Sequence, residues 1–200
     1  MSEQFEIHIV SDGKHTLEDF ARKAAEIEPY VDYFHLREKD KTAKEIFHGI
    51  CLLKDLGIPS SKIIVNDRVD AAVAMNVAGV QLAHHSLDVM TVKETFPKLK
   101  IGRSIHSIEE ARSEEANGAN YLLFGHIFAS GSKPDLQPRG LEELEKVVNA
   151  VAIPVIAIGG ISPQHMKDII STGAKGVAIM SGVLAAPDPV EAIQAYINVP

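Results

Sequence analysis

Residues 154–182 read PVIAIGGISPQHMKDIISTGAKGVAIMSG, and this stretch decides the fold. An apolar run of strand length ends in Gly159-Gly160, and about one helix later a second such run ends in Ser181-Gly182. Parallel strands that end in small residues at the start of a helix leave backbone N–H groups uncovered, and these donors suit a phosphate group. In an eight-stranded α/β barrel the loops after strands 7 and 8 often have this role. The stretch therefore predicts a parallel α/β fold that binds a small phosphorylated molecule.

The rest of the chain repeats this alternation of strand-like and helix-like segments. Several strand candidates are apolar throughout, as expected of strands covered on both faces. The predicted strands are Glu6–Val10, Tyr33–Arg37, Ile63–Asn66, Gly79–Leu82, Lys100–Ser104, Tyr121–Gly125, Pro154–Ile158 and Gly176–Met180. The predicted helices are Leu17–Glu28, Ala43–Leu56, Val69–Met75, Val89–Phe96, Ile108–Asn117, Leu141–Ala150, Pro163–Ser171 and Pro189–Ile197. Thr16, Ser107 and Ser162 precede three of these helices as N-cap residues.

Eight β-α pairs in 200 residues give about 25 residues per unit, which is enough for a (β/α)8 TIM barrel. The rival is a doubly wound open sheet, but its glycine-rich fingerprint is absent after the first strand, where the sequence reads Ser11-Asp12-Gly13-Lys14. No composition shift marks a boundary. We therefore predict a single TIM-barrel domain over residues 1–200.

Composition narrows the function classes. The net charge is −7 and the basic residues are scattered, which argues against a nucleic-acid surface. Cys51 is the single cysteine, so no disulfide forms within the chain. No apolar run approaches the roughly 20 residues of a membrane span, and the N-terminus lacks the pattern of a secretory signal. We expect a soluble cytoplasmic protein; a homo-oligomer is left open.

Polar residues gather at the expected carboxyl ends of the strands, where a barrel has its chemistry. Each also has a structural interpretation: Arg37 and Lys39 can be solvated charges, and Asn66-Asp67 can cap the next helix. His84 and His85 point in opposite directions and lack further ligands at suitable spacing, so we expect no metal site there. The candidate substrate- and phosphate-binding residues are Arg37, Lys39, Asn66, Ser104, Lys133, Gly159, Gly160, Ser181 and Gly182.

His126 is the candidate catalytic residue. It follows Tyr121–Gly125, the most apolar of the predicted strands, and should emerge at the mouth of the barrel. An imidazole titrates near neutral pH, so one side chain can accept a proton and then return it. His8 and His35 fall within strands and are interpreted instead as core or edge residues.

These residues carry a resemblance to the thiamin phosphate synthase superfamily over essentially the whole chain. The resemblance rests on segments that are specific together: 34–39 (FHLREK), 65–70 (VNDRVD), 79–82 (GVQL), 101–107 (IGRSIHS), 130–133 (SGSK) and the two small-residue turns. It implies the same (β/α)8 fold. Two branches are relevant. Synthases join a pyrimidine pyrophosphate to a thiazole phosphate with a magnesium ion held by two acidic residues, and TenI-type proteins aromatise a carboxythiazole phosphate.

Three departures from the synthase pattern favour the TenI-type branch. Ser86 stands at the second acidic magnesium ligand, His35 replaces a glutamine on the second strand, and His126 replaces a proline after the sixth. In TenI-type proteins that histidine is the proton carrier. The resemblance therefore implies an isomerase, a thiazole tautomerase of thiamin biosynthesis. It would act on a small phosphorylated thiazole without cofactor or metal and without nucleic-acid or membrane partners.

Two alternatives stay open. Magnesium-dependent thiamin phosphate synthesis is the second candidate, because synthase character is kept by Arg37, Lys39, Asn66, Asp67, Ser104 and the cluster of Ser130, Ser132 and Lys133. A non-catalytic TenI-type barrel that binds a thiamin precursor and regulates a partner is the third.

Overall fold

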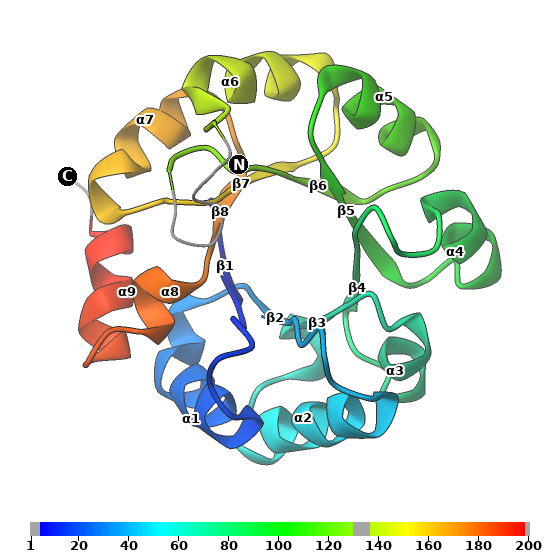
Figure 1. Ribbon diagram of the computed structural model, residues 1–200, viewed down its shortest axis with the longest axis vertical. Helices are drawn as coiled ribbons and strands as arrows, with labels where there is room; N and C mark the ends of the chain where they lie inside the picture. The colour runs from blue at the N-terminus through cyan, green and yellow to red at the C-terminus, as the bar shows by residue number, and fades with distance from the viewer. Residues whose placement is uncertain (1–4, 130–136, 199–200) are drawn as a thin grey trace.

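The computed structural model describes residues 5–129 and 137–198. Eight parallel strands form a closed barrel in which each strand pairs with the next along the chain, and β8 pairs with β1 to close the ring (Figure 1). The strands are β1 (Glu6–Val10), β2 (Tyr33–Leu36), β3 (Ile63–Asn66), β4 (Gly79–Leu82), β5 (Lys100–Ile105), β6 (Tyr121–Gly125), β7 (Val155–Ile158) and β8 (Gly176–Ile179). The predicted (β/α)8 barrel is confirmed.

Helices surround the barrel as an outer ring (Figure 1). They are α1 (Leu17–Ile27), α2 (Ala43–Asp55), α3 (Val69–Ala74), α4 (Val89–Thr95), α5 (Ile108–Ala116), α6 (Gly140–Ala150), α7 (Met166–Ser171), α8 (Ser181–Leu184) and α9 (Pro189–Ile197). Thr16 and Ser107 cap α1 and α5 as expected, since each side-chain oxygen accepts from the N–H three residues on. Within the described part of the chain, no helix has the length and apolar character of a membrane span.

Two differences from the sequence expectations lie near the ends of β7 and β8. Pro163–His165 forms a 3₁₀ turn before α7 instead of the first turn of an α-helix. The short helix α8 was not predicted, because four residues are too few to show a helical period. It begins directly at the Ser181-Gly182 turn.

Two separate apolar cores position the mouth of the barrel. The larger fills the space between strands and helices and takes the outward side chains, such as Phe34, Val65 and Leu122. The smaller lies inside the barrel and consists of Val10, Tyr121, Leu123, Ile156 and Ala178. Close packing on both sides of the strands holds their carboxyl ends at fixed positions.

Candidate functional site

The predicted site residues lie at one mouth of the barrel, because the carboxyl ends of parallel strands meet on the same side. Asn66 is the last residue of β3, Ser104 is the penultimate residue of β5, and Arg37 follows β2 directly. The described residues at or next to these strand ends are Arg37, Lys39, Asn66, Ser104, His126, Gly159, Gly160, Ser181 and Gly182. The remaining candidate, Lys133, lies outside the described residues.

His126 and the Gly159-Gly160 turn pack against each other where β6 and β7 end. A Cβ atom on Gly159 would lie 2.4 Å from the Cβ of His126, so only glycine fits beside this histidine. The φ angles of Gly159 and Gly160 are +102° and +67°, a region that glycine adopts without steric penalty. The N–H of Phe128 donates to the carbonyl oxygen of Gly159 at 3.0 Å. His126 is therefore held beside the turn predicted to bind phosphate.

The turn between β8 and α8 forms the second corner of small residues. α8 begins at Ser181, so the first N–H groups of this turn, including that of Gly182, have no carbonyl partner within the helix. A Cβ atom on Gly182 would lie 2.2 Å from the hydroxyl oxygen of Tyr196. That hydroxyl donates to the carbonyl oxygen of Ile161 at 3.0 Å. α9 thereby connects the ends of β7 and β8, while Ser181 and Gly182 stay exposed.

The ends of β2, β3 and β4 form a polar side of the mouth with mixed charge. The N–H of Arg37 donates to the Oγ of Ser11 at 2.8 Å, which fixes the end of β2 against β1. Asp67 has a φ of +66°, and its Oδ2 lies 3.8 Å from the Nε2 of His85. The Oγ of Ser86 accepts from the N–H of Ala83 at 2.8 Å. Within residues 5–129 and 137–198, no three His, Cys, Asp or Glu side chains are grouped as metal ligands.

Buried polar side chains line the barrel interior, and the sequence analysis did not single them out as a site. His8 and His35 are core residues, as interpreted, and both are fully buried. The Nδ1 of His8 lies 2.9 Å from the Nε2 of His35, and the Nε2 of His8 lies 2.9 Å from the Oε2 of Glu6. The Nε2 of Gln81 donates to the Oγ of Ser104 at 3.1 Å, which connects this interior to a predicted site residue.

Four polar atoms in this interior are buried with no hydrogen-bond partner among the described residues. They are the Nδ1 of His35, the Oδ1 of Asn66, the Oε1 of Gln81 and the hydroxyl of Tyr121, and we call these four residues the polar floor. A Cβ atom on Gly102 would lie within 2.4 Å of both the Gln81 and the Tyr121 oxygen, so Gly102 makes room for them. Strand parity could have indicated the floor, because His35 lies two positions before Arg37 and shares its face.

Burial changes the titration of this interior. Burial lowers the pKa of His8, although the hydrogen bond to Glu6 opposes this effect. Burial, with the nearby His8 and Lys100, lowers the pKa of His35 well below its usual range. Burial also raises the pKa of Tyr121 well above that of a free phenol. At neutral pH the interior therefore holds neutral imidazoles and a neutral phenol.

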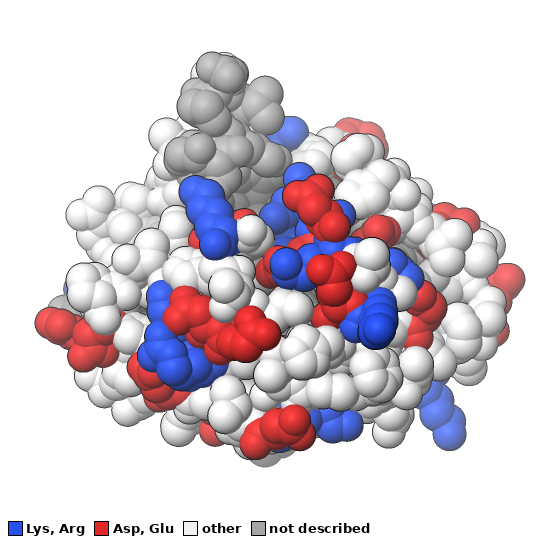
Figure 2. All heavy atoms as spheres, turned by 60° about the horizontal axis from the view of Figure 1, so that its bottom comes forward, with Lys and Arg blue, Asp and Glu red and all other residues white. Residues whose placement is uncertain are grey.

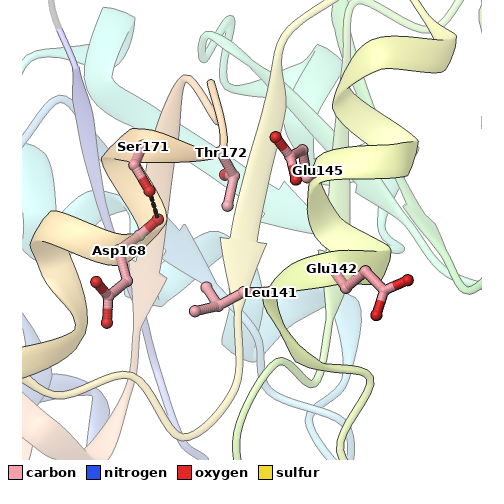
Figure 3. Close-up of a pocket in the computed structure, with 6 residues that line it drawn as sticks. All are labelled: Leu141, Glu142, Glu145, Asp168, Ser171 and Thr172. Atoms are coloured by element: carbon pink, nitrogen blue, oxygen red, sulfur yellow. Dashed lines mark hydrogen bonds between the residues drawn. The ribbon is translucent and has the colours of Figure 1, made fainter.

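A groove between α6 and α7 lies in the outer helical ring, away from the mouth (Figure 3). Its lining includes the carboxylates of Glu142, Glu145 and Asp168, which repel an anion. Figure 2 shows acidic and basic side chains interspersed over the face in view, without a broad basic patch among the residues coloured there. The strand-end mouth is thus the better candidate site.

Comparisons with known proteins agree on one family. The sequence model described as thiamine monophosphate synthase matches residues 7–183. The thiamine-phosphate synthase of Clostridium acetobutylicum is 37% identical over 91% of this chain and 88% of its own length, and that of Pyrococcus horikoshii is 35% identical over 93% and 90%. The solved thiamine phosphate pyrophosphorylase from Pyrococcus furiosus superposes with a TM-score of 0.83 at 32% identity, over 98% of this chain and 96% of that one.

These matches correct the expected activity. The thiazole tautomerase interpretation, with its isomerase class and TenI-type branch, is wrong, because the relatives similar over most of the chain are named synthases. The error came from giving Ser86, His35 and His126 more weight than the synthase-like residues around the mouth. Single substitutions at a mouth change local chemistry and leave the scaffold and most contacts intact. Both the sequence match and the barrel show that the chain belongs to the thiamine monophosphate synthase family.

Proposed function

We propose that the protein is a thiamine-phosphate synthase, a transferase that joins a pyrimidine pyrophosphate to a thiazole phosphate. The observation that carries this proposal is that the mouth holds two groups of residues suited to anions. Arg37 and Lys39 follow β2, and the small-residue turns follow β7 and β8, which lie three and two strands from β2 around the ring. Two such groups suit two phosphorylated substrates. The relatives from Clostridium acetobutylicum and Pyrococcus horikoshii, which are named thiamine-phosphate synthases, support the same proposal.

The synthase reaction requires that the two substrates are aligned and that the charge on the departing pyrophosphate is stabilised. A C–N bond forms between the thiazole nitrogen and a carbon of the pyrimidine half, while the C–O bond to pyrophosphate breaks. The nitrogen attacks with its own lone pair, so no base has to remove a proton first. Arg37 and Lys39 would stabilise the departing pyrophosphate, and the Gly160 and Gly182 turns would hold the thiazole phosphate. His126, which lies beside Gly159, would contact the substrate.

A synthase of this kind implies a magnesium ion, and the residues at the mouth supply the smallest number of carboxylates with which such an ion is usually held. Magnesium is usually held by one or two carboxylates plus substrate phosphates and water. Asp67 supplies one carboxylate at the mouth, with 43% of its side chain exposed, and Ser86 supplies only a hydroxyl. When bound, the ion would neutralise charge on the pyrophosphate. Asp67 and the phosphate oxygens of the substrate would hold it.

The test is a coupled assay with both substrate halves and magnesium, which measures thiamin phosphate and pyrophosphate. We expect both products in equal amounts, and a fall of roughly 10²-fold or more in Asp67→Asn, since a lost charge stabiliser costs about this much. Asp70→Asn is the matched control, because Asp70 pairs with Arg68 on the outside of α3. No product with the unmodified protein would refute the proposal.

A further inference from the structure

A continuous series of hydrogen bonds runs through the barrel interior from Glu6 to His35. The Oε2 of Glu6, at the start of β1, lies 2.9 Å from the Nε2 of His8. The Nδ1 of His8 lies 2.9 Å from the Nε2 of His35 on the neighbouring strand β2. Both imidazoles are fully buried, so bulk water does not compete for these contacts.

The carboxylate of Glu6 at the start of the series determines which atom donates in each hydrogen bond. Burial raises the pKa of Glu6, but the hydrogen bond from His8 and the charges nearby outweigh burial, so this pKa lies below its ordinary value and the carboxylate is ionised. An ionised carboxylate only accepts, so the Nε2 of His8 carries the proton. A neutral imidazole has one N–H, so the Nδ1 of His8 accepts from the Nε2 of His35. The Nδ1 of His35 is then left with a lone pair and no proton.

The far end of this series lies beneath the substrate mouth. The side chain of Asn66, the last residue of β3, is near enough to His35 to raise the pKa of that imidazole, although burial outweighs this effect. The Nδ1 of His35 and the Oδ1 of Asn66 are both buried, and neither has a partner with hydrogen-bond geometry among the described residues. A buried polar group left unpaired costs about 1–3 kcal/mol. An amino or hydroxyl group of a ligand that reaches the polar floor would remove this cost.

We propose that Glu6 and His8 are positioning residues that fix the tautomer of His35, so that its Nδ1 is presented beneath the mouth as an acceptor for an N–H or O–H group of the bound substrate. The fixed tautomer is a property of the free protein. Only the final contact with substrate rests on the proposed function.

The tautomers are measured by long-range ¹⁵N–¹H NMR of the unliganded, uniformly ¹⁵N-labelled protein at neutral pH. His8→Gln and His35→Gln assign the two imidazole patterns. We expect both rings to be neutral with the proton on Nε2. A proton on the Nδ1 of His35, or a charged His35 ring, would overturn the proposal.

The dependence on Glu6 is tested in the same spectra with Glu6→Ala and Glu6→Gln. We expect each to release His8 into a mixture of tautomers and to move the His35 signals in step. Glu26→Gln, which removes an exposed carboxylate of α1 paired with Arg22, should leave both patterns unchanged. His35 signals that are insensitive to the loss of Glu6 would show that the series does not fix its tautomer.

A final arm examines the substrate contact. The pyrimidine pyrophosphate is added to the labelled protein, and inorganic pyrophosphate serves as the comparison because it has no hydrogen bond to donate from a ring substituent. We expect the pyrimidine compound to shift the Nδ1 signal of His35 and inorganic pyrophosphate to leave it in place. Equal shifts, or none with either compound, would overturn the acceptor role, even where the coupled assay supports synthase activity.

Discussion

In the proposed divalent-ion site, the Ser86 hydroxyl would bind the ion more weakly than a second carboxylate would. This hydroxyl accepts from the N–H of Ala83 at 2.8 Å, and a carboxylate at this position can keep that bond and add a negative charge. We expect Ser86→Asp to lower the magnesium concentration for half-maximal thiamin phosphate formation by roughly tenfold, the effect of about 1.4 kcal/mol. Magnesium titration of the coupled assay measures this. Ser113→Asp on exposed α5 is the control, and equal titration curves for the two variants would contradict the expectation.

Gly159 needs to be glycine for two reasons, its positive φ angle and its contact with His126. Comparison with a second glycine separates them. The φ of Gly159 is +102° and an added Cβ would meet the Cβ of His126 at 2.4 Å. Gly57 has a similar φ of +93° with no atom within 4 Å. We expect Gly57→Ala to cost about 1 kcal/mol of unfolding free energy from backbone strain, and Gly159→Ala to cost about 1–3 kcal/mol more because His126 must move. Urea unfolding measures both variants. Equal losses of unfolding free energy would mean that His126 moves aside at no cost.

At the scale of elements, α2 depends on a reciprocal cap at its first turn. The Oγ1 of Thr42 accepts from the N–H of Glu45, and the Glu45 carboxylate accepts from the N–H of Thr42 at 2.8 Å. We expect Thr42→Ala to lower the free energy of unfolding by about 1 kcal/mol. Thr42→Ser keeps the hydroxyl and should stay near the original value in the same urea titrations. An equal loss in both variants would assign the effect to the lost methyl group.

Local patterns were enough to predict most elements. The bounds of β1, β3, β4 and β6 agree with the sequence prediction residue for residue, because each is a short and largely apolar run of strand length. α8 escaped prediction because its four residues show no period. The polar floor was also missed. Strand parity places His35 on the same face as Arg37, but it does not show which residues of the other strands meet it. His35, Gln81 and Tyr121 come together only once β2, β4 and β6 share one interior.

At the scale of the whole molecule, closure of the barrel brings together residues that no single motif connects. β1 and β8, at opposite ends of the sequence, pair through the Cα partners Glu6 and Gly176. An added Cβ on Gly176 would lie 2.4 Å from the carbonyl oxygen of Glu6, so glycine allows the strands to approach. The sequence predicted that the mouth gathers these strand ends. It misjudged the reaction, because family patterns at three positions say less than similarity over the full chain.

The buried imidazoles make global stability depend on pH. Burial lowers the pKa of His8 and of His35 below the ordinary value of 6.5, and Glu6, Asp32 and Lys100 are the charges that face them. Below pH 6.5 these two histidines therefore bind protons in the unfolded chain while they stay neutral in the folded barrel. The free energy of unfolding therefore falls as the pH falls. The slope should approach about 1.4 kcal/mol per pH unit for each histidine that stays neutral.

Urea unfolding between about pH 8 and pH 5, the range in which histidine titrates, measures this slope. His35→Gln should reduce this slope by the contribution of one proton. His48→Gln is the control and should leave the slope unchanged, because His48 is exposed on α2. A stability that is flat across this range would mean that the interior admits protons while folded. A neutral His35 at pH 7 would then no longer follow from burial.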